Sequence, residues 1–257
     1  MVLTFVYPIP IPCTLYLYMR PIIGITMDWE EKGTFSKRPY YALRESYFDI
    51  IYKAGGLPLA IPYIAEAIDE YLARISALVV PGGDFALSRD WYMDPDEEKP
   101  WPPSKRLDFD MAIIKRALDK NIPFLGICAR MQVMGGVSGA KMTPNVNKYL
   151  STSIDHRNQN PPDQFAHEVK VVTNSLLHRI TGKENFPVNT AHSEAIIETP
   201  QNILISAKAE DGGIEAIERT DKDFAIGLQW HPEFFLDDDN PGLLIFKALV
   251  EKARGRV

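Results

Sequence analysis

The segment NIPFLGICARMQVMGG, residues 121–136, is the stretch that decides the fold. Ile122–Ile127 is an apolar run too short for a helix, Cys128 ends it, and the residues that follow favour a helix. The pattern therefore predicts a strand, a tight turn that carries Cys128, and a helix. A cysteine at the end of an apolar strand is more often a small buried hydrophobic residue, so the turn alone does not establish a nucleophile.

The predicted turn nevertheless suits a reactive cysteine. The free N–H groups and the partial positive charge at the N-terminus of the following helix favour the thiolate over the thiol. A nucleophile between a strand and a helix has the geometry of a nucleophile elbow.

Strands and helices alternate in the N-terminal half of the chain. We expect strands at residues 21–27, 57–61, 77–80 and 122–127, and helices at 40–54, 64–75 and 107–120. Such alternation predicts a mostly parallel sheet with helices on both faces. Gly82-Gly83 and Cys128 each follow a strand, so both belong at the carboxyl ends of the strands, where ligands collect.

The C-terminal half predicts an antiparallel extension of this sheet. Strands are expected at residues 167–173, 186–197, 203–209, 213–218 and 224–229, and a last helix at 242–253. Turn residues at Asp211–Gly213 and Asp221–Asp223 indicate hairpins. Residues 84–105 and 143–165 are expected to be loops, the first of them either a wall of the site or a solvated insertion.

Length and composition indicate one α/β domain that binds neither nucleic acid nor membranes. The chain has 257 residues and a net charge of −6 without a basic run. Its two cysteines make no disulfide framework, so a reducing, cytoplasmic compartment is the simplest setting. No Cys/His spacing indicates zinc and no glycine-rich loop indicates a nucleotide, so we expect neither metal nor cofactor. A homodimer is compatible with the sequence, which leaves the oligomeric state open.

The first 19 residues differ from the rest. They contain three prolines and no charged residue before Arg20, and they lack the basic start of a signal peptide. Our hypothesis is that Met19 is the physiological start. Residues 1–19 would then be a non-native or disordered extension, and 20–257 a single domain.

The last predicted strand is followed by Trp230-His231-Pro232-Glu233. Residues two apart in an extended segment project the same way, so the carboxylate of Glu233 can reach the imidazole of His231 and fix its tautomer. Together with the cysteine turn, this motif predicts a Cys–His–Glu triad.

Three motifs in this order resemble the class I glutamine amidotransferase-like superfamily: Pro81-Gly82-Gly83, Gly126-Ile127-Cys128 with Gln132, and Gln229–Glu233. Segments 20–26, 40–58, 155–157, 165–169 and 188–193 look more narrowly like the γ-glutamyl-γ-aminobutyrate hydrolase family. The resemblance implies a flavodoxin-like sheet and a cofactor-free, cytoplasmic cysteine hydrolase of a small γ-glutamyl amide. The family is associated with polyamine breakdown, but the sequence does not show which amine is attached.

The resemblance also implies roles for individual residues. Cys128 would be the nucleophile, His231 the general base and then acid, and Glu233 the group that orients His231. The backbone N–H groups of Gly83 and Ala129 would hold the oxyanion. Substrate contacts are expected from Gln132, His192, Arg130 and His156. Three alternatives stay open: Gln132 could merely pack, His192 could be structural, and His156 could be plain surface. His167 and His178 are assigned to structure.

Arg130 departs from the family, whose elbow usually has Cys-Arg-Gly where this chain has Cys128-Ala129-Arg130. Either the helix moves outward, or Arg130 lies across the mouth of the site, where it could pair with a substrate carboxylate or block the pocket. Two other functions therefore stay open. One is a glutaminase subunit that passes ammonia to a separate synthetase, and the other is a catalytically impaired ligand-binding relative.

Overall fold

The computed structural model describes residues 19–83, 87–93, 105–158 and 160–256. Within these ranges the main sheet has nine strands in the order β4-β1-β5-β6-β13-β12-β11-β8-β9. Their bounds are β1 Ile22–Thr26, β4 Leu57–Ile61, β5 Ala77–Val80, β6 Phe124–Ile127, β8 His167–Val171, β9 Asn185–Val188, β11 Ile203–Ala209, β12 Ile214–Arg219 and β13 Ala225–Leu228.

The sheet has a parallel and an antiparallel half. Strands β4, β1, β5, β6 and β13 pair in parallel, whereas β12, β11, β8 and β9 continue the sheet with antiparallel pairing. The turns predicted at residues 211–213 and 221–223 join β11 to β12 and β12 to β13. The predicted fold class, a mostly parallel sheet with an antiparallel extension, is confirmed.

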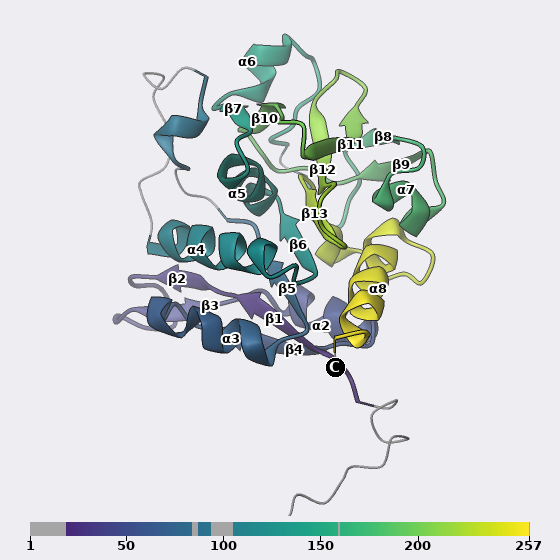
Figure 1. Cartoon of the computed structure of the whole chain (residues 1–257). Helices are drawn as coiled ribbons and strands as arrows, with labels where there is room; N and C mark the ends of the chain where they lie inside the picture. Colours follow the sequence, from purple (N-terminus) through teal and green to yellow (C-terminus); the bar gives the residue numbers. More distant parts are fainter. Residues whose placement is uncertain (1–18, 84–86, 94–104, 159, 257) are drawn as a thin grey trace, which may run out of the picture.

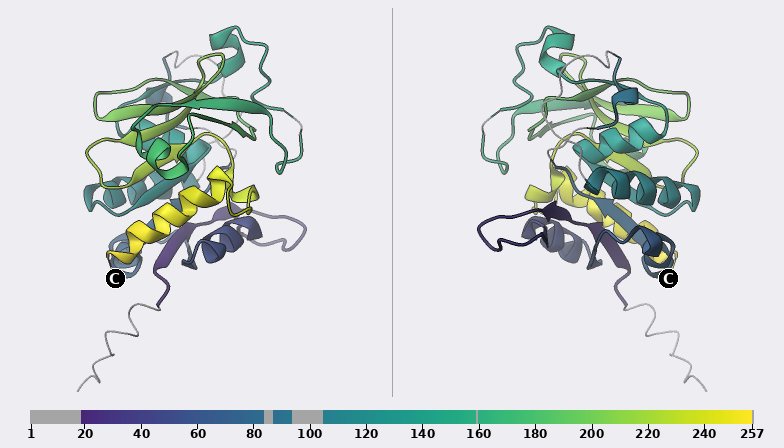
Figure 2. Two further views of the ribbon diagram at one scale, coloured as in Figure 1. Left: turned by 90° about the vertical axis from the view of Figure 1, so that its right-hand side faces the viewer. Right: turned by 90° about the vertical axis from the view of Figure 1, so that its left-hand side faces the viewer.

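Helices cover both faces of the sheet (Figures 1 and 2). One face packs against α2 (Glu45–Lys53), α7 (Leu176–Thr181) and α8 (Pro241–Arg254), the other against α3 (Ile68–Arg74), α4 (Lys105–Asp119) and α5 (Ala129–Val137). In β5, Ala77 and Val79 enter the first of these cores and Leu78 and Val80 the second. Because both faces are covered, this strand is apolar at every position.

Several expected elements have different boundaries. The segment at residues 40–54 begins as strand β3 (Tyr40–Ala42), paired with β2 (Asp28–Glu30), and becomes helical only at Glu45. The strand expected at 186–197 is two strands, β9 and β10 (Ala195–Glu198), and β10 pairs with β7 (Lys141–Thr143). The expected loop at 143–165 contains α6 (Val146–Leu150), and α7 was not expected. Short 3₁₀ turns form at η1 Ala65–Ala67, η2 Arg89–Trp91 and η3 Pro232–Phe234.

Some predictions fall on segments outside the described residues. These are residues 1–18 of the expected extension and most of the loop at 84–105. Among the helices of the described ranges, none combines the length and the apolar content needed to cross a bilayer.

Candidate active site

Cys128 lies on a strained turn between β6 and α5. Its backbone has φ 53° and ψ −115°, a conformation that costs free energy for any residue other than glycine. The N–H of Cys128 donates to the carbonyl of Leu228 on β13 at 2.7 Å, which holds the turn at the carboxyl edge of the sheet. The observed strand, strained turn and helix have the arrangement of a nucleophile elbow.

Gly82 brings the end of β5 against the elbow. A Cβ atom on Gly82 would lie 3.0 Å from the Cβ of Cys128 and 3.1 Å from the Cε1 of His231. The three segments that were predicted to carry the site therefore meet at one place. A side chain at residue 82 would crowd both Cys128 and the ring of His231, which is the physical reason for glycine here.

His231 is oriented by Glu233. The Nδ1 atom of His231 lies 2.9 Å from the Oε1 atom of Glu233, whose side chain is fully buried. An extended segment was predicted here, and this detail is wrong because Pro232–Phe234 forms the 3₁₀ turn η3. The turn still brings the carboxylate to the ring.

The surroundings of His231 favour its protonated form. Burial by itself lowers the pKa of His231, but the negative charges of Glu233 and Cys128, and hydrogen bonds to both, raise it to about 10. At neutral pH the ring is then an imidazolium next to the cysteine. Tyr47 is also buried beside Glu233, and burial and the charge of Glu233 raise the pKa of Tyr47 well above its ordinary value.

Asn189 holds the backbone of His231 from both sides. Its Oδ1 accepts from the N–H of His231 at 2.8 Å, and its Nδ2 donates to the carbonyl of His231 at 2.9 Å. Asn189 was predicted to lie inside a strand and had no predicted role in the site. The available signal was its position in the family-like segment at residues 188–193.

A comparison with known protein families matches residues 21–233 to Peptidase C26. The chain belongs to this family.

Individual relatives agree with this membership. A glutamine amidotransferase-like protein of Rickettsia prowazekii is 31% identical, over 91% of this chain and 98% of its own length. The γ-glutamyl-γ-aminobutyrate hydrolase of Escherichia coli is 27% identical, over 90% of this chain and 92% of its own. A solved structure from Thermoplasma acidophilum, described as one subunit of a GMP synthase, has a TM-score of 0.60 at 18% identity. The match covers 93% of this chain and 96% of the other, and it supports the fold alone.

Arg130, where this Peptidase C26 chain departs from the usual elbow, lies inside the protein. Its side chain is fully buried, and its Nε is 2.6 Å from Oδ2 of Asp110 on α4. Arg106 shares the same carboxylate oxygen at 3.1 Å. The prediction that Arg130 lies across the mouth of the site and contacts substrate is wrong, because its charge is taken up by a buried carboxylate.

The elbow helix has not moved outward either. A Cβ on Gly126 of β6 would lie 2.7 Å from the carbonyl oxygen of Arg130, and one on Gly227 of β13 would lie 2.9 Å from Cα of Met131. These two strand glycines let the helix backbone approach the sheet closely. The glycine missing from the helix is thus compensated by glycines in the strands beneath it.

Gln132 supports the site from within the protein. Its Nε2 donates to the carbonyl of Glu194 at 2.7 Å and to Oε1 of Gln229 at 3.0 Å. Gln229 in turn donates through its Nε2 to Sγ of Cys128 at 3.6 Å. The side chain of Gln132 is almost fully buried, which favours the packing role over the expected substrate contact.

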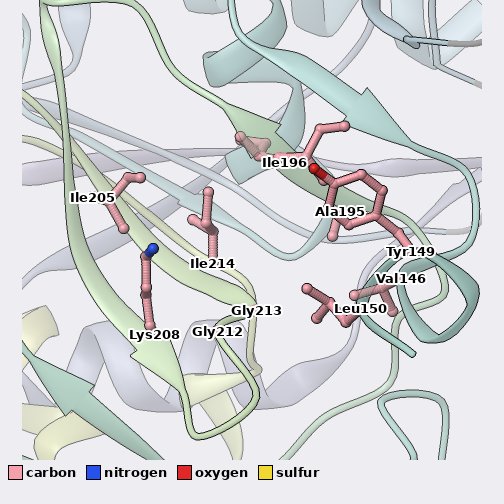
Figure 3. Close-up of a pocket in the computed structure, with 11 residues that line it drawn as sticks. Val146, Tyr149, Leu150, Ala195, Ile196, Ile205, Lys208, Gly212, Gly213 and Ile214 are labelled. Atoms are coloured by element: carbon pink, nitrogen blue, oxygen red, sulfur yellow. The ribbon is translucent and has the colours of Figure 1, made fainter. Parts of the chain in front are cut away.

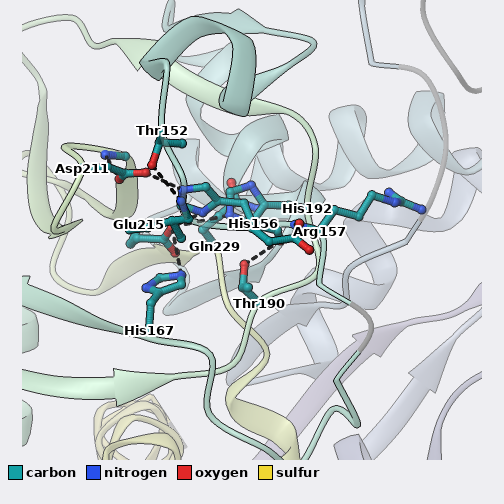
Figure 4. Close-up of polar contacts among 12 residues, drawn as sticks. Thr152, His156, Arg157, His167, Thr190, His192, Asp211, Glu215 and Gln229 are labelled. Carbon is teal, nitrogen blue, oxygen red and sulfur yellow. Dashed lines mark hydrogen bonds and ion pairs between the residues drawn. The ribbon is translucent and has the colours of Figure 1, made fainter.

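His156 and His192 lie in a buried cluster with His167 around Glu215 (Figure 4). The side chain of His156 is fully buried, so the alternative left open for it, plain surface, is wrong. Both ring nitrogens of His156 and of His192 are directed at protein groups rather than at Cys128, so their expected substrate contact is not made in this structure.

A separate pocket lies between α6, β10, β11 and β12 (Figure 3). It is lined mostly by apolar side chains such as Val146, Leu150 and Ile214, and Lys208 is the one charged residue of its lining. None of the predicted site residues lines this pocket, so it provides no nucleophile or base.

Proposed function

We propose that this chain hydrolyses the amide bond of a small γ-glutamyl compound through a thioester on Cys128. The observation that carries the proposal is the His231 imidazole, held at 2.9 Å by buried Glu233 and placed next to a cysteine on a strained elbow. Membership in Peptidase C26 supports a hydrolase, and the similarity to the hydrolase of Escherichia coli supports a γ-glutamyl amide as substrate.

The first half of the reaction forms the thioester. The thiolate of Cys128 attacks the γ-carbonyl carbon, and the carbonyl oxygen becomes an oxyanion. The N–H of Ala129, the first residue of α5, has no acceptor within its own helix and is available to the oxyanion, with Gly83 as the second donor. As the C–N bond breaks, His231 gives its proton to the leaving amine.

The second half releases glutamate. Neutral His231 takes a proton from a water molecule, which attacks the thioester carbon, and the bond to Sγ breaks to restore the thiolate. The net change is one water consumed and one amine and one glutamate formed. Glu233 keeps the ring of His231 in one tautomer through both halves.

A panel of γ-glutamyl amides, offered to the wild type and to Cys128→Ala, tests the proposal. We expect wild-type turnover of at least one amide, and loss by roughly 10⁶-fold in the variant, since removing a triad nucleophile alone has that order of effect. A matched control is His178→Ala on α7, outside the site.

Mass spectrometry of quenched wild-type protein should show a γ-glutamyl adduct on the peptide that contains Cys128. Equal hydrolysis by the wild type and Cys128→Ala would contradict the proposal. The glutaminase alternative would be favoured if glutamine were the only substrate that released its amine, as ammonia, and if this release required a separate synthetase.

A further inference from the structure

We propose that His156, His167, His192 and Glu215 bind one Zn²⁺ ion in a closed structural site apart from the catalytic triad (Figure 4). Three of them, His156, His167 and Glu215, offer ligand atoms that all lie within 4.8 Å of one another. His192 is the fourth proposed ligand, because its Nε2 lies 3.4 Å from Oε1 of Glu215. The four residues come from separate parts of the chain: the loop after α6, strand β8, the loop before β10, and strand β12. The proposal does not depend on the proposed hydrolase activity.

The spacing around Glu215 leaves room for an ion. Its Oε1 atom lies 3.5 Å from Nδ1 of His156, 3.8 Å from Nε2 of His167 and 3.4 Å from Nε2 of His192. Charge-assisted hydrogen bonds are shorter, about 2.7–2.9 Å. Two ligands of a tetrahedral Zn²⁺, each at about 2.0–2.2 Å from the metal, lie about 3.3–3.6 Å apart, which is close to the observed separations.

The other nitrogen of each ring is held by an acceptor. These contacts are His156 Nε2 to Asp211 Oδ2 at 2.9 Å, His167 Nδ1 to the carbonyl of Glu168 at 3.2 Å, and His192 Nδ1 to the carbonyl of Glu194 at 3.0 Å. An acceptor on one nitrogen places the hydrogen there, so the opposite nitrogen of a neutral ring presents a lone pair. Metal-bound histidines are usually held in this way by a carboxylate or a carbonyl.

The atoms that face one another lack hydrogen-bond partners. They are Nδ1 of His156, Nε2 of His167, Nε2 of His192 and both carboxylate oxygens of Glu215, and all five are buried. Buried polar atoms without partners are costly. A Zn²⁺ ion among them would bind all three nitrogens and the carboxylate, and its two positive charges would balance Glu215 and the nearby Asp211.

The site is closed, which indicates a structural ion. The exposed fractions of the side chains are 0% for His156, 7% for His167, 3% for His192 and 0% for Glu215. Four protein ligands without an open position are typical of structural zinc. The ion would fasten β12 to the loops beside it, and the carbonyl of Glu215 accepts from the N–H of Gln229, two residues before His231.

Zinc titration of the full chain in a Cys128→Ala background tests the proposal, because this background removes the catalytic thiolate as a rival ligand. A chromophoric chelator competes for the metal, and the bound zinc is quantified by elemental mass spectrometry. We expect one tightly bound Zn²⁺ per chain. We also expect Co²⁺ to give the intense visible absorption of a four-coordinate ion.

The variants separate this site from other histidines. Glu215→Gln and His167→Ala should lose the bound ion, whereas His178→Ala, outside the cluster, and His231→Ala, in the triad, should keep it. Asp211→Asn retains the four ligands and should weaken binding about 10- to 100-fold. This conservative variant keeps the test valid if Glu215→Gln does not fold. No saturable zinc binding, or equal affinity with and without the Glu215 carboxylate, would overturn the proposal and leave a cluster of protonated histidines paired with Glu215.

Discussion

His231 and the three histidines around Glu215 are each held by an acceptor on one ring nitrogen, but their second nitrogens face different groups. In the triad the second nitrogen of one ring faces a single cysteine at the edge of the sheet. In the cluster the second nitrogens of three rings face one carboxylate in the interior. An acceptor on one nitrogen therefore orients the ring at both places. In the triad the ring is oriented for proton transfer, and in the cluster three ring nitrogens are directed at one carboxylate. What differs is the number of rings and the charge of the group they meet.

Among changes to the groups that hold His231, the largest expected effect comes from removing the acceptor in the triad. Glu233→Gln should lower kcat about 10⁴-fold, because the amide no longer holds the ring in the tautomer that can exchange a proton with Cys128. Zinc content should stay at the wild-type value, since Glu233 does not contact the cluster. Steady-state kinetics and metal analysis of the same preparation measure both.

The matched control for that change is Glu251→Gln on α8, whose side chain is 80% exposed. It makes the same substitution away from both sites and should leave kcat unchanged. If Glu233→Gln hydrolysed γ-glutamyl amides at the wild-type rate, the carboxylate would not be the group that makes His231 catalytic, and the contrast between the two sites would fail.

A smaller effect is expected from Asn189, which holds the backbone of His231 rather than its ring. Asn189→Ala removes both hydrogen bonds to that backbone, and a displaced catalytic group commonly costs about 10²-fold in rate. We expect the loss in kcat with little change in KM. Asn202→Ala, in the turn before β11, is the control. An unchanged kcat in Asn189→Ala would show that η3 positions His231 without help.

Much of the triad was predictable because each part has a local sequence signal. An apolar run before Cys128 predicts the strand, the helix formers after it predict α5, and Gly82-Gly83 and His231-Pro232-Glu233 each follow an apolar strand. Parallel pairing then brings the strand ends together. The arrangement of sheet and helices followed from the same alternation.

Arg130 was not predictable because its direction depends on a partner from another helix. The sequence shows a long charged side chain after the nucleophile, for which solvent is the usual place. Its place in the interior depends on Asp110, which is one of three acidic residues of α4 and is not distinguished from the others by the sequence. The strand glycines that make room for the helix, Gly126 and Gly227, are informative only once their strands are known to lie beneath α5.

The histidine cluster was not predictable for a related reason. Zinc motifs are recognised by short spacings, but His156, His167, His192 and Glu215 are spread over four segments that meet only through the antiparallel half of the sheet. His156 was expected on a polar loop, with plain surface as the open alternative, and His192 was expected inside a continuous strand. Those two expectations hid the convergence.

The smallest expected effect concerns the proton on His231 and probes what that ring faces. Its pKa of about 10 depends on the negative charges of Glu233 and Cys128. In the wild type, the ring should therefore keep its proton as the pH rises past the ordinary histidine value of about 6.5, and release it only near 10. Cys128→Ala and Cys128→Ser both remove the charge of the sulfur, so both should lower the pKa of His231. If the size of the side chain at residue 128 set this pKa instead, the two variants would differ from each other. NMR titration of the His231 ring measures this directly, and each unit of change is tenfold in the protonation equilibrium. A wild-type ring that titrates near 6.5 would mean that the cysteine and carboxylate do not act on it, and His231 would then be oriented but not charged.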